Sequence, residues 1–238
     1  ARLALAGNQL ALVHGINTVP DPRIENRRHQ KALTDVLDST TGQITDAAGI
    51  WCSHSFDQRY LVDGADIYEA HLGDAYPRQV PVARIRDGVS GAGSALFHPK
   101  GLSGDNNTFT RLGALARIDA GPAAGRFLLL VATERTTGTA TRVSGSRDLA
   151  LVRTTADFAA DPKANPLDGA FGTTFDVTSG GTTKTNRLKW LTDYHVDAPD
   201  VDHAERPKLV ALGGGEFLVA WERWSIEGQR GRFEGTYA

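Results

Sequence analysis

A short cassette occurs twice near the start of the chain, with the same length and the same order of residue types. The segments RLALAGNQLALVH at 2–14 and RYLVDGADIYEAH at 59–71 each run from an Arg, through two apolar runs separated by a Gly-containing turn, to a His. Less regular copies open at Arg111 and Arg206, with longer turns between their apolar runs. Such internal repetition predicts a chain built from similar supersecondary units.

Short runs rich in Val, Leu and Thr follow each cassette, and turn residues separate them throughout the chain. Gly is abundant, with 26 residues among 238, and no stretch keeps a helical period between capping residues. We therefore predict an all-β chain with little helix. Its blade-like units of three or four antiparallel strands are expected at about 1–52, 53–107, 108–194 and 195–238.

Turn residues give the expected strand boundaries within these units. Two-residue turns are predicted at Gly7-Asn8 and Asp63-Gly64, because Gly accepts the positive φ that tight hairpins need. The segment 89–107, rich in Gly and Ser, is predicted to be mostly loop. The segment 156–185, which holds Pro and several Gly, is interpreted as an excursion on the surface. The segment 186–194 alternates between apolar and polar residues and predicts an outer strand for the third unit.

The spacing of the units resembles that of β-propellers. Equivalent second strands centred on Leu10, Ile67, Leu129 and Phe217 lie 57, 62 and 88 residues apart, and propeller blades are four-stranded sheets of about this size. A β-sandwich would explain the strands but not the repeated cassette. The Trp-Asp signature and the sialidase box are missing, so the resemblance is to the architecture and to no particular family. We expect this sequence to be part of a six- to eight-bladed ring completed by further sequence or another chain; an incomplete four-bladed ring is the alternative.

Composition excludes several classes of function. The net charge is −2, with 26 basic and 28 acidic residues well mixed, which argues against nucleic acid as the main partner. The longest apolar run, 127–132, is too short to cross a bilayer. A single cysteine, Cys52, excludes an intrachain disulfide. No Met stands at position 1, which indicates signal-peptide cleavage, proteolysis or excision from a longer product. We expect a secreted or cell-surface location.

The resemblance to propellers implies that loops from different blades meet on one face. His and Trp residues are concentrated in or beside these loops, and guanidinium, imidazole, carboxylate and indole groups together suit a polar ligand. The residues expected to bind the ligand are Arg59, His71, Asp74, Arg78, Arg206 and Trp224.

The arginines that open the four units, Arg2, Arg59, Arg111 and Arg206, allow two interpretations. Their planar guanidinium groups could grip a carboxylate, sulfate or phosphate. Equivalent charges in a repeat more often bind an acidic side chain, with Asp57, Asp74, Glu134 and Glu222 as candidates. His14 and His71 end equivalent strands, but the other units hold Thr133 and Trp221 in that place. We therefore expect these histidines to pack between blades rather than to bind a metal.

Two further stretches suggest specific chemistry. The segment 193–203 carries four Asp and two His, and Asp197, Asp200 and Asp202 could hold Ca²⁺ through hard oxygen ligands. The same segment could instead supply a carboxylate pair for glycoside hydrolysis. On an extended strand, Trp221 and Trp224 point to opposite faces, so one is expected in the core while the other could be a platform for a sugar ring.

These observations lead to three hypotheses. The first is a non-catalytic extracellular propeller without a required cofactor, which binds a glycan or an extracellular protein through loops on one face. The second is a hydrolase or lyase acting on a polysaccharide. The third is a structural subunit of a larger assembly.

Overall fold

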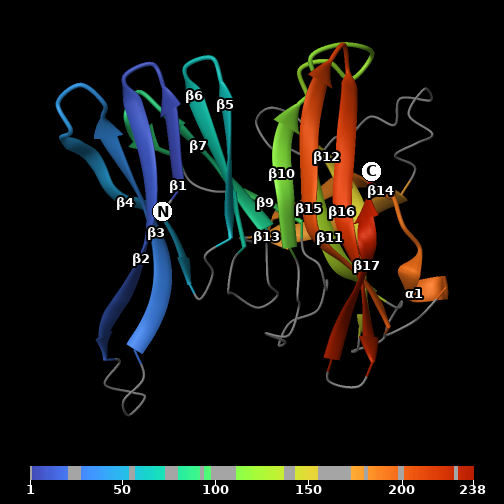
Figure 1. Ribbon diagram of the computed structural model, residues 1–238. Coiled ribbons are helices and arrows are strands. Elements are labelled where there is room, and N and C mark those ends of the chain that lie inside the picture. The colour runs from blue at the N-terminus through green and yellow to red at the C-terminus, as the bar shows by residue number, and fades with distance from the viewer. Residues whose placement is uncertain are drawn as a thin grey trace. The chain divides into compact units, whose positions relative to one another are not determined.

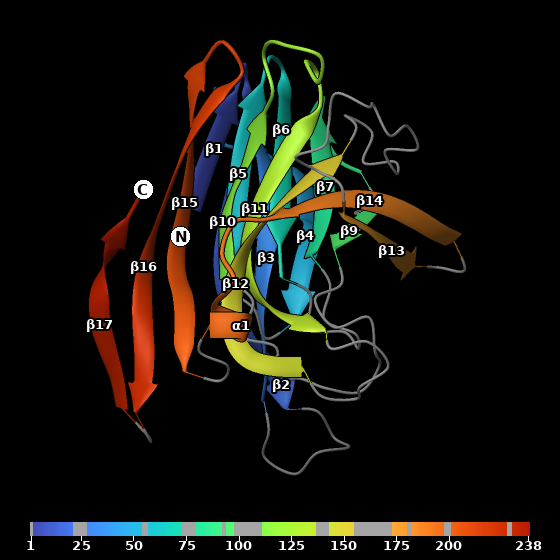
Figure 2. The same ribbon diagram turned by 90° about the vertical axis from the view of Figure 1, so that its right-hand side faces the viewer.

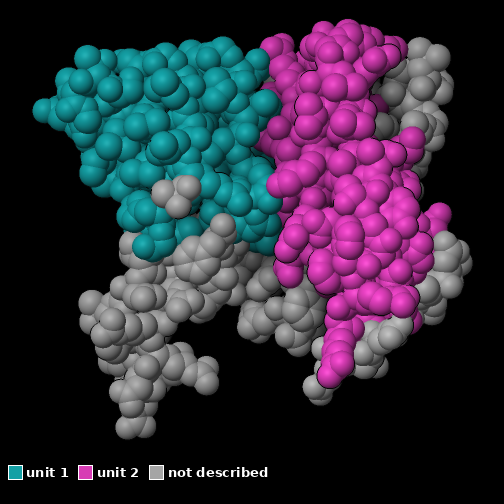
Figure 3. All heavy atoms as spheres, in the orientation of Figure 1, with its two compact units in different colours: residues 1–75, 79–95 teal, residues 76–78, 96–238 magenta. Residues whose placement is uncertain are grey.

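The computed structural model describes residues 2–20, 28–53, 57–72, 80–91, 94–97, 111–136, 143–154, 173–179, 182–197, 201–227 and 230–238. The described residues form antiparallel sheets and one short helix, α1 (Tyr194–Asp197), as Figure 1 shows. This confirms the all-β prediction. None of the helical structure in these ranges is long and apolar enough to span a membrane. The chain separates into unit 1 (1–75 and 79–95) and unit 2 (76–78 and 96–238), coloured in Figure 3.

The first sheet of unit 1 is a four-stranded meander, as the sequence predicts. Its strands pair in chain order and are β1 (Arg2–Ala6), β2 (Gln9–Pro20), β3 (Arg28–Asp38) and β4 (Ile44–Ser53). The β1–β2 turn lies at Gly7-Asn8, where Gly7 has φ of 58°. The first predicted hairpin is therefore confirmed.

The second sheet of unit 1 also follows the cassette. Its strands are β5 (Gln58–Asp63), β6 (Asp66–His71), β7 (Val80–Arg86), β8 (Val89–Ser90) and β9 (Ser94–Phe97). The β5–β6 turn is Gly64-Ala65, because Asp63 pairs with Asp66, so the prediction of Asp63-Gly64 is one residue early. The segment 89–107, predicted to be mostly loop, forms the two short strands β8 and β9 within its described residues. Both strands are short, so they carry little periodic signal.

The core of unit 1 lies between its two sheets. The first sheet contributes mainly small side chains, such as Ala4, Ala6 and Ala11, and the second contributes Ile67 and Ile85. Hydrogen bonds tie the turns of the second sheet to the first: Ser90 N–H donates to Asp46 (2.8 Å), and Gly88 N–H donates to Gln9 Oε1 (3.1 Å). Within this unit these hydrogen bonds therefore fix the position of one sheet against the other.

Unit 2 begins with a sheet that contains an unexpected hairpin. The strands are β10 (Arg111–Arg117), β11 (Phe127–Thr136), β12 (Val143–Thr154), β13 (Thr173–Ser179) and β14 (Thr182–Trp190), and Figure 2 shows β13 and β14 extending away from β12. Within the predicted surface excursion at 156–185, residues 173–179 and 182–185 form strands that the sequence did not predict. The Gly-Gly pair between two Thr-rich runs is a hairpin signal.

Three long strands complete unit 2: β15 (Asp202–Gly213), β16 (Glu216–Glu227) and β17 (Arg230–Tyr237). They lie side by side in Figure 2. One parallel pair, Arg147 with His203, links β12 to β15 and joins the strands of the third and fourth predicted units into one sheet. Ala204 and Leu209 of β15 pack with Leu130 and Leu149 in a shared core.

Gly113 shows how tightly this core is packed. It lies at a register shift between Leu112 and Ala114, and a Cβ added there would come within 2.9 Å of Leu130 Cβ. Leu130 is fully buried and cannot move aside. We expect Gly113→Ala to lower the free energy of unfolding by about 1–3 kcal/mol in urea denaturation. In a Leu130→Ala background the penalty should become smaller, because the contacts with Leu130 Cδ2 (2.6 Å) and Cγ (2.7 Å) are removed while the contact with Cβ stays; an equal penalty in both backgrounds would contradict this packing.

Candidate functional site

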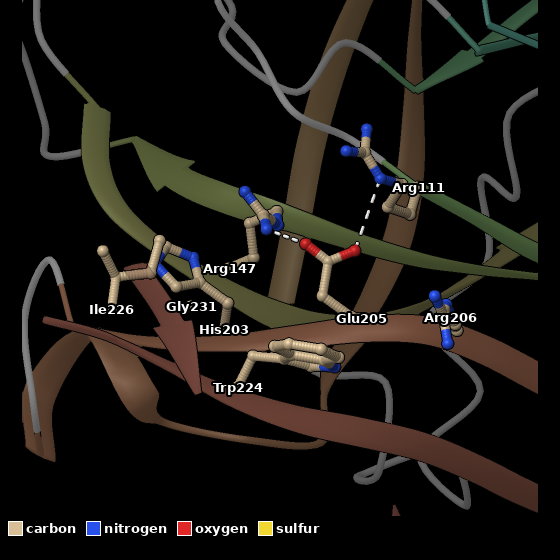
Figure 4. A pocket seen from close by; sticks show the side chains of 8 residues that line it. All are labelled: Arg111, Arg147, His203, Glu205, Arg206, Trp224, Ile226 and Gly231. Carbon is tan, nitrogen blue, oxygen red and sulfur yellow. Dashed lines mark ion pairs between the residues drawn. The ribbon is translucent and has the colours of Figure 1, made fainter. Parts of the chain in front are cut away.

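A pocket of about 320 Å³ opens on unit 2, where β10, β12 and the last three strands come together (Figure 4). Its lining combines three guanidinium groups, one imidazole, one carboxylate and one indole. The lining residues are Arg111, Arg147, His203, Glu205, Arg206, Trp224, Ile226 and Gly231.

Strand alternation brings these residues to one side of the sheet. His203 is the cross-strand partner of Trp224, so their side chains share a face, while Ala204 between His203 and Glu205 turns into the core. The ladder shifts register between Glu205 and Lys208. Arg206 lies at this bulge with φ of 46°, one of two non-Gly residues with positive φ among those described. The irregularity in β15 is therefore located at the pocket.

Glu205 lies between two of the arginines, as Figure 4 shows. Its carboxylate forms ion pairs with Arg147 and, at 3.4 Å, with Arg111 Nε. The Arg147 and Glu205 side chains are only 10% and 17% exposed. This charged group is thus a largely buried and well-fixed part of the wall.

A second carboxylate fixes the indole ring. Trp224 Nε1–H donates to Glu222 Oε2 (2.8 Å), and Glu222 Oε1 lies 3.1 Å from Arg206. The hydrogen bond from Trp224, followed by that from Arg206, lowers the pKa of Glu222, so this carboxyl is ionised at neutral pH. Phe233 packs edge-on against the indole at 5.7 Å. A Cβ added at Gly231 would lie 3.4 Å from Cε3 of this indole, so any side chain there would contact the ring.

The second tryptophan, Trp221, lies on the other face of the same strands. Trp221 packs against the core, donates from Nε1 to Tyr194 Oη (3.0 Å) and stacks on Tyr237. The structure thus packs Trp221 against the core and places Trp224 in the pocket. On the Trp221 face Asp202 is buried and forms an ion pair with Arg223.

All four repeated arginines have carboxylate partners. Arg2 and Arg59 both pair with Asp57, Arg111 pairs with Glu205, and Arg206 pairs with Glu222. In each unit of the structure, the first repeated Arg pairs with an acidic residue that lies just before the second repeated Arg in the sequence. Sequence reasoning named Asp57 and Glu222 but missed Glu205; its place directly before Arg206 was the available signal.

Two predicted ligand-binding residues, Arg59 and His71, lie in unit 1. Arg59 also donates to Gln58 O (2.8 Å). His71 is buried on β6 with its Nδ1 3.6 Å from Oε1 of Glu69, a fully buried carboxyl that the sequence did not single out. His14, at the equivalent place in the cassette, does not end its strand as predicted, because β2 continues to Pro20. It is more exposed than His71 and contacts Asp35 at 2.9 Å. Arg206 and Trp224, by contrast, line one pocket in unit 2.

The remaining predicted residues concern the acidic segment. Asp74, Arg78 and Asp200 lie outside the described residues, and the side chain of Asp197 on α1 does too. Among the described side chains there is no group of three or more His, Cys, Asp or Glu residues able to hold a metal. Calcium binding at Asp197, Asp200 and Asp202 stays a prediction.

Asp148 of β12 organises the turn around α1. It is fully buried and accepts hydrogen bonds from Thr192 Oγ1 (2.8 Å), Tyr194 N–H (2.6 Å) and His195 N–H (3.3 Å). Its Oδ2 also lies 2.9 Å from His195 Nδ1. No local pattern predicts this role, since Asp148 lies within a strand and is distant from the turn along the chain.

No family model and no curated protein matches the chain. One solved structure that resembles it is a mutant of the GH43 protein BlXynB from Bacillus licheniformis, with a TM-score of 0.43 and 14% sequence identity. The match covers 94% of this chain and 36% of that chain, so this chain spans about a third of its length. We therefore take the chemistry of the site from the residues of this chain alone.

Proposed function

We propose that this protein binds a carbohydrate, with one sugar residue seated in the pocket of unit 2. The observation that carries the proposal is the indole ring of Trp224, fixed by Glu222 at the wall of a pocket lined with guanidinium and carboxylate groups. Sugar rings offer an apolar face to an aromatic plane and hydroxyl groups to charged hydrogen-bonding side chains. This pocket offers both an aromatic plane and charged hydrogen-bonding side chains.

The size and rigidity of the pocket support this proposal. Its volume of about 320 Å³ is at the lower end of the range for small-molecule sites, which suits one or two sugar units. Glu205 is fixed by two arginines, and Trp224 is fixed by Glu222 and Phe233. A wall that is ordered before the ligand arrives reduces the entropy lost on binding.

The carboxyl groups favour binding over hydrolysis. A glycosidase needs an acid whose pKa is raised so that it still holds a proton at working pH. Glu222 is shifted the opposite way, and Glu205 is paired with two guanidinium groups. Among the described carboxyls a raised pKa belongs to Glu69, which is fully buried in unit 1. We therefore place non-catalytic binding first; an extracellular setting stays a prediction.

Replacing Trp224 by Ala tests the proposal. An oligosaccharide found by screening a glycan panel should bind the variant about 30-fold more weakly, because a buried aromatic anchor contributes about 2 kcal/mol. Isothermal titration calorimetry gives the affinities, with Tyr237→Ala as control, since Tyr237 stacks on Trp221 outside the pocket. An unchanged affinity in Trp224→Ala, or no glycan ligand for the intact protein, would refute the proposal.

A further inference from the structure

We propose that the sugar is acidic, carrying a carboxylate that Arg206 recognises. This inference rests on the proposed function and names the ligand class for the same pocket. A uronic acid residue is the simplest sugar of this kind. Its planar carboxylate matches the guanidinium fork, which can donate two parallel hydrogen bonds to it.

The charges around the pocket favour an anion. Three guanidinium groups line it, and two carboxylates, Glu205 and Glu222, pair with them. Glu205 faces two of these cations at once. The pocket lining itself thus carries three guanidinium groups and one carboxylate, although the chain as a whole has a net charge of −2.

Arg206 is the guanidinium best placed to change partner. Its side chain is 70% exposed, compared with 10% for Arg147 and 43% for Arg111, and Figure 4 shows it apart from the group around Glu205. Its pair with Glu222 is an exposed one, and such pairs contribute little to stability. A ligand carboxylate could therefore engage Arg206 while Glu222 keeps its hydrogen bond from Trp224.

The backbone at Arg206 gives an independent reason. A residue with a side chain is strained at φ of 46°, and a residue before a proline, here Pro207, ordinarily adopts the extended region. Strained residues of this kind concentrate at ligand-binding sites, where the strain fixes the direction of a side chain. A Gly would fit this position without strain, yet the chain has an Arg there.

Three ligands that share the same type of sugar ring and the same length test the inference. They are a galacturonic acid oligomer, its methyl ester and a sulfated galactose oligomer. The methyl ester removes the charge and keeps the sugar ring. By calorimetry we expect the acid to bind at least about tenfold more tightly than the ester, as one charge-assisted pair provides. Raising the salt concentration should weaken the acid more than the ester.

Arg206→Gly separates recognition from folding. It relieves the positive φ, so its thermal midpoint should equal or exceed that of the wild type, while the affinity ratio of acid to ester should fall to near one. Arg232→Ala is the control, because Arg232 is exposed, pairs with Glu234 and lies outside the pocket; it should keep the ratio.

The outcomes distinguish this inference from the proposed function. Equal binding of acid and ester overturns the acidic ligand, and a preserved ratio in Arg206→Gly overturns recognition by Arg206. Both outcomes leave carbohydrate binding standing. If the sulfated oligomer binds more tightly than the acid, the inference that the site recognises a carboxylate is overturned. If none of the three ligands binds and the glycan panel is also negative, the proposed function itself fails.

Discussion

Replacing Glu69 by Gln is expected to make the protein less stable at low pH, with the free energy of unfolding rising by about 3 kcal/mol between pH 4 and pH 7.5. In the wild type, Glu69 and His71 should together cause little change over the same range. The difference arises because two buried groups on β6 have pKa values shifted in opposite directions.

Both shifts have the same physical cause. Glu69 and His71 are 0% and 6% exposed, and burial disfavours the charged form of each. Burial raises the pKa of Glu69 from 4.5 to about 7, against hydrogen bonds from Thr34 and Tyr60, and lowers the pKa of His71 from 6.5 to about 4. Thr34 Oγ1 donates to Glu69 Oε2 at 2.6 Å. Within the described part of the chain, Glu69 Oε1 and His71 Nδ1 have no hydrogen-bond partner.

The signs follow from proton linkage. The raised pKa of Glu69 stabilises the fold at low pH, and this contribution is lost as pH rises from 4.5 to about 7. The lowered pKa of His71 does the reverse: stability is lost as pH falls from 6.5 to about 4. Between pH 4.5 and 6.5 the unfolded chain holds a proton on His71 and the folded chain holds one on Glu69. The two effects largely cancel.

Each single variant therefore shows how the free energy of unfolding depends on pH through the group that remains. Glu69→Gln leaves His71 and should gain stability with rising pH, whereas His71→Gln leaves Glu69 and should lose about 2.5 kcal/mol between pH 5 and pH 8. Urea denaturation across pH, with each curve taken relative to the wild type, measures both. Parallel curves for the two variants would show that this pair does not carry opposite shifts.

Asp148→Ala is expected to lower the free energy of unfolding by about 3–5 kcal/mol, because removing a buried hydrogen-bonded carboxylate leaves its donors without a partner. Thr192 Oγ1, Tyr194 N–H and His195 N–H would lose their acceptor, and α1 would lose its anchor on β12. Thermal and urea denaturation give the size of the effect. Hydrogen exchange of the Tyr194 amide should accelerate as well.

Asp38→Ala is a matched control for this variant. Asp38 also accepts three hydrogen bonds, from Thr40 N–H (2.9 Å), Thr41 N–H (2.8 Å) and Thr41 Oγ1 (3.1 Å), but these bonds are exposed. Water can replace them, so the loss should be much smaller. Equal losses in the two variants would mean that the burial of Asp148 is not what makes it important.

Local sequence signals predicted the strands well. The repeated cassette located β1, β2, β5 and β6, because tight turns with Gly and alternating apolar residues act over a few neighbours. The same alternation separated Trp221 from Trp224. It could not settle which of the two faces the core, because that depends on the strands packed against each face.

The missed features depend on contacts between distant segments. Glu205 matters because Arg111 and Arg147 reach it from other strands, and Asp148 matters because the turn before β15 folds back onto β12. Glu69 becomes unusual only when Thr34 and the rest of the first sheet cover it. The β13–β14 hairpin was missed for a different reason, since its Gly and Thr residues also suit a surface loop.

The most direct measurement is the crystal structure of the protein with a bound galacturonic acid oligomer. We predict that one sugar ring lies against the indole of Trp224, with its carboxylate within hydrogen-bond distance of Arg206. An oligomer bound at another surface, or bound at Trp224 with its carboxylate directed away from Arg206, would contradict it.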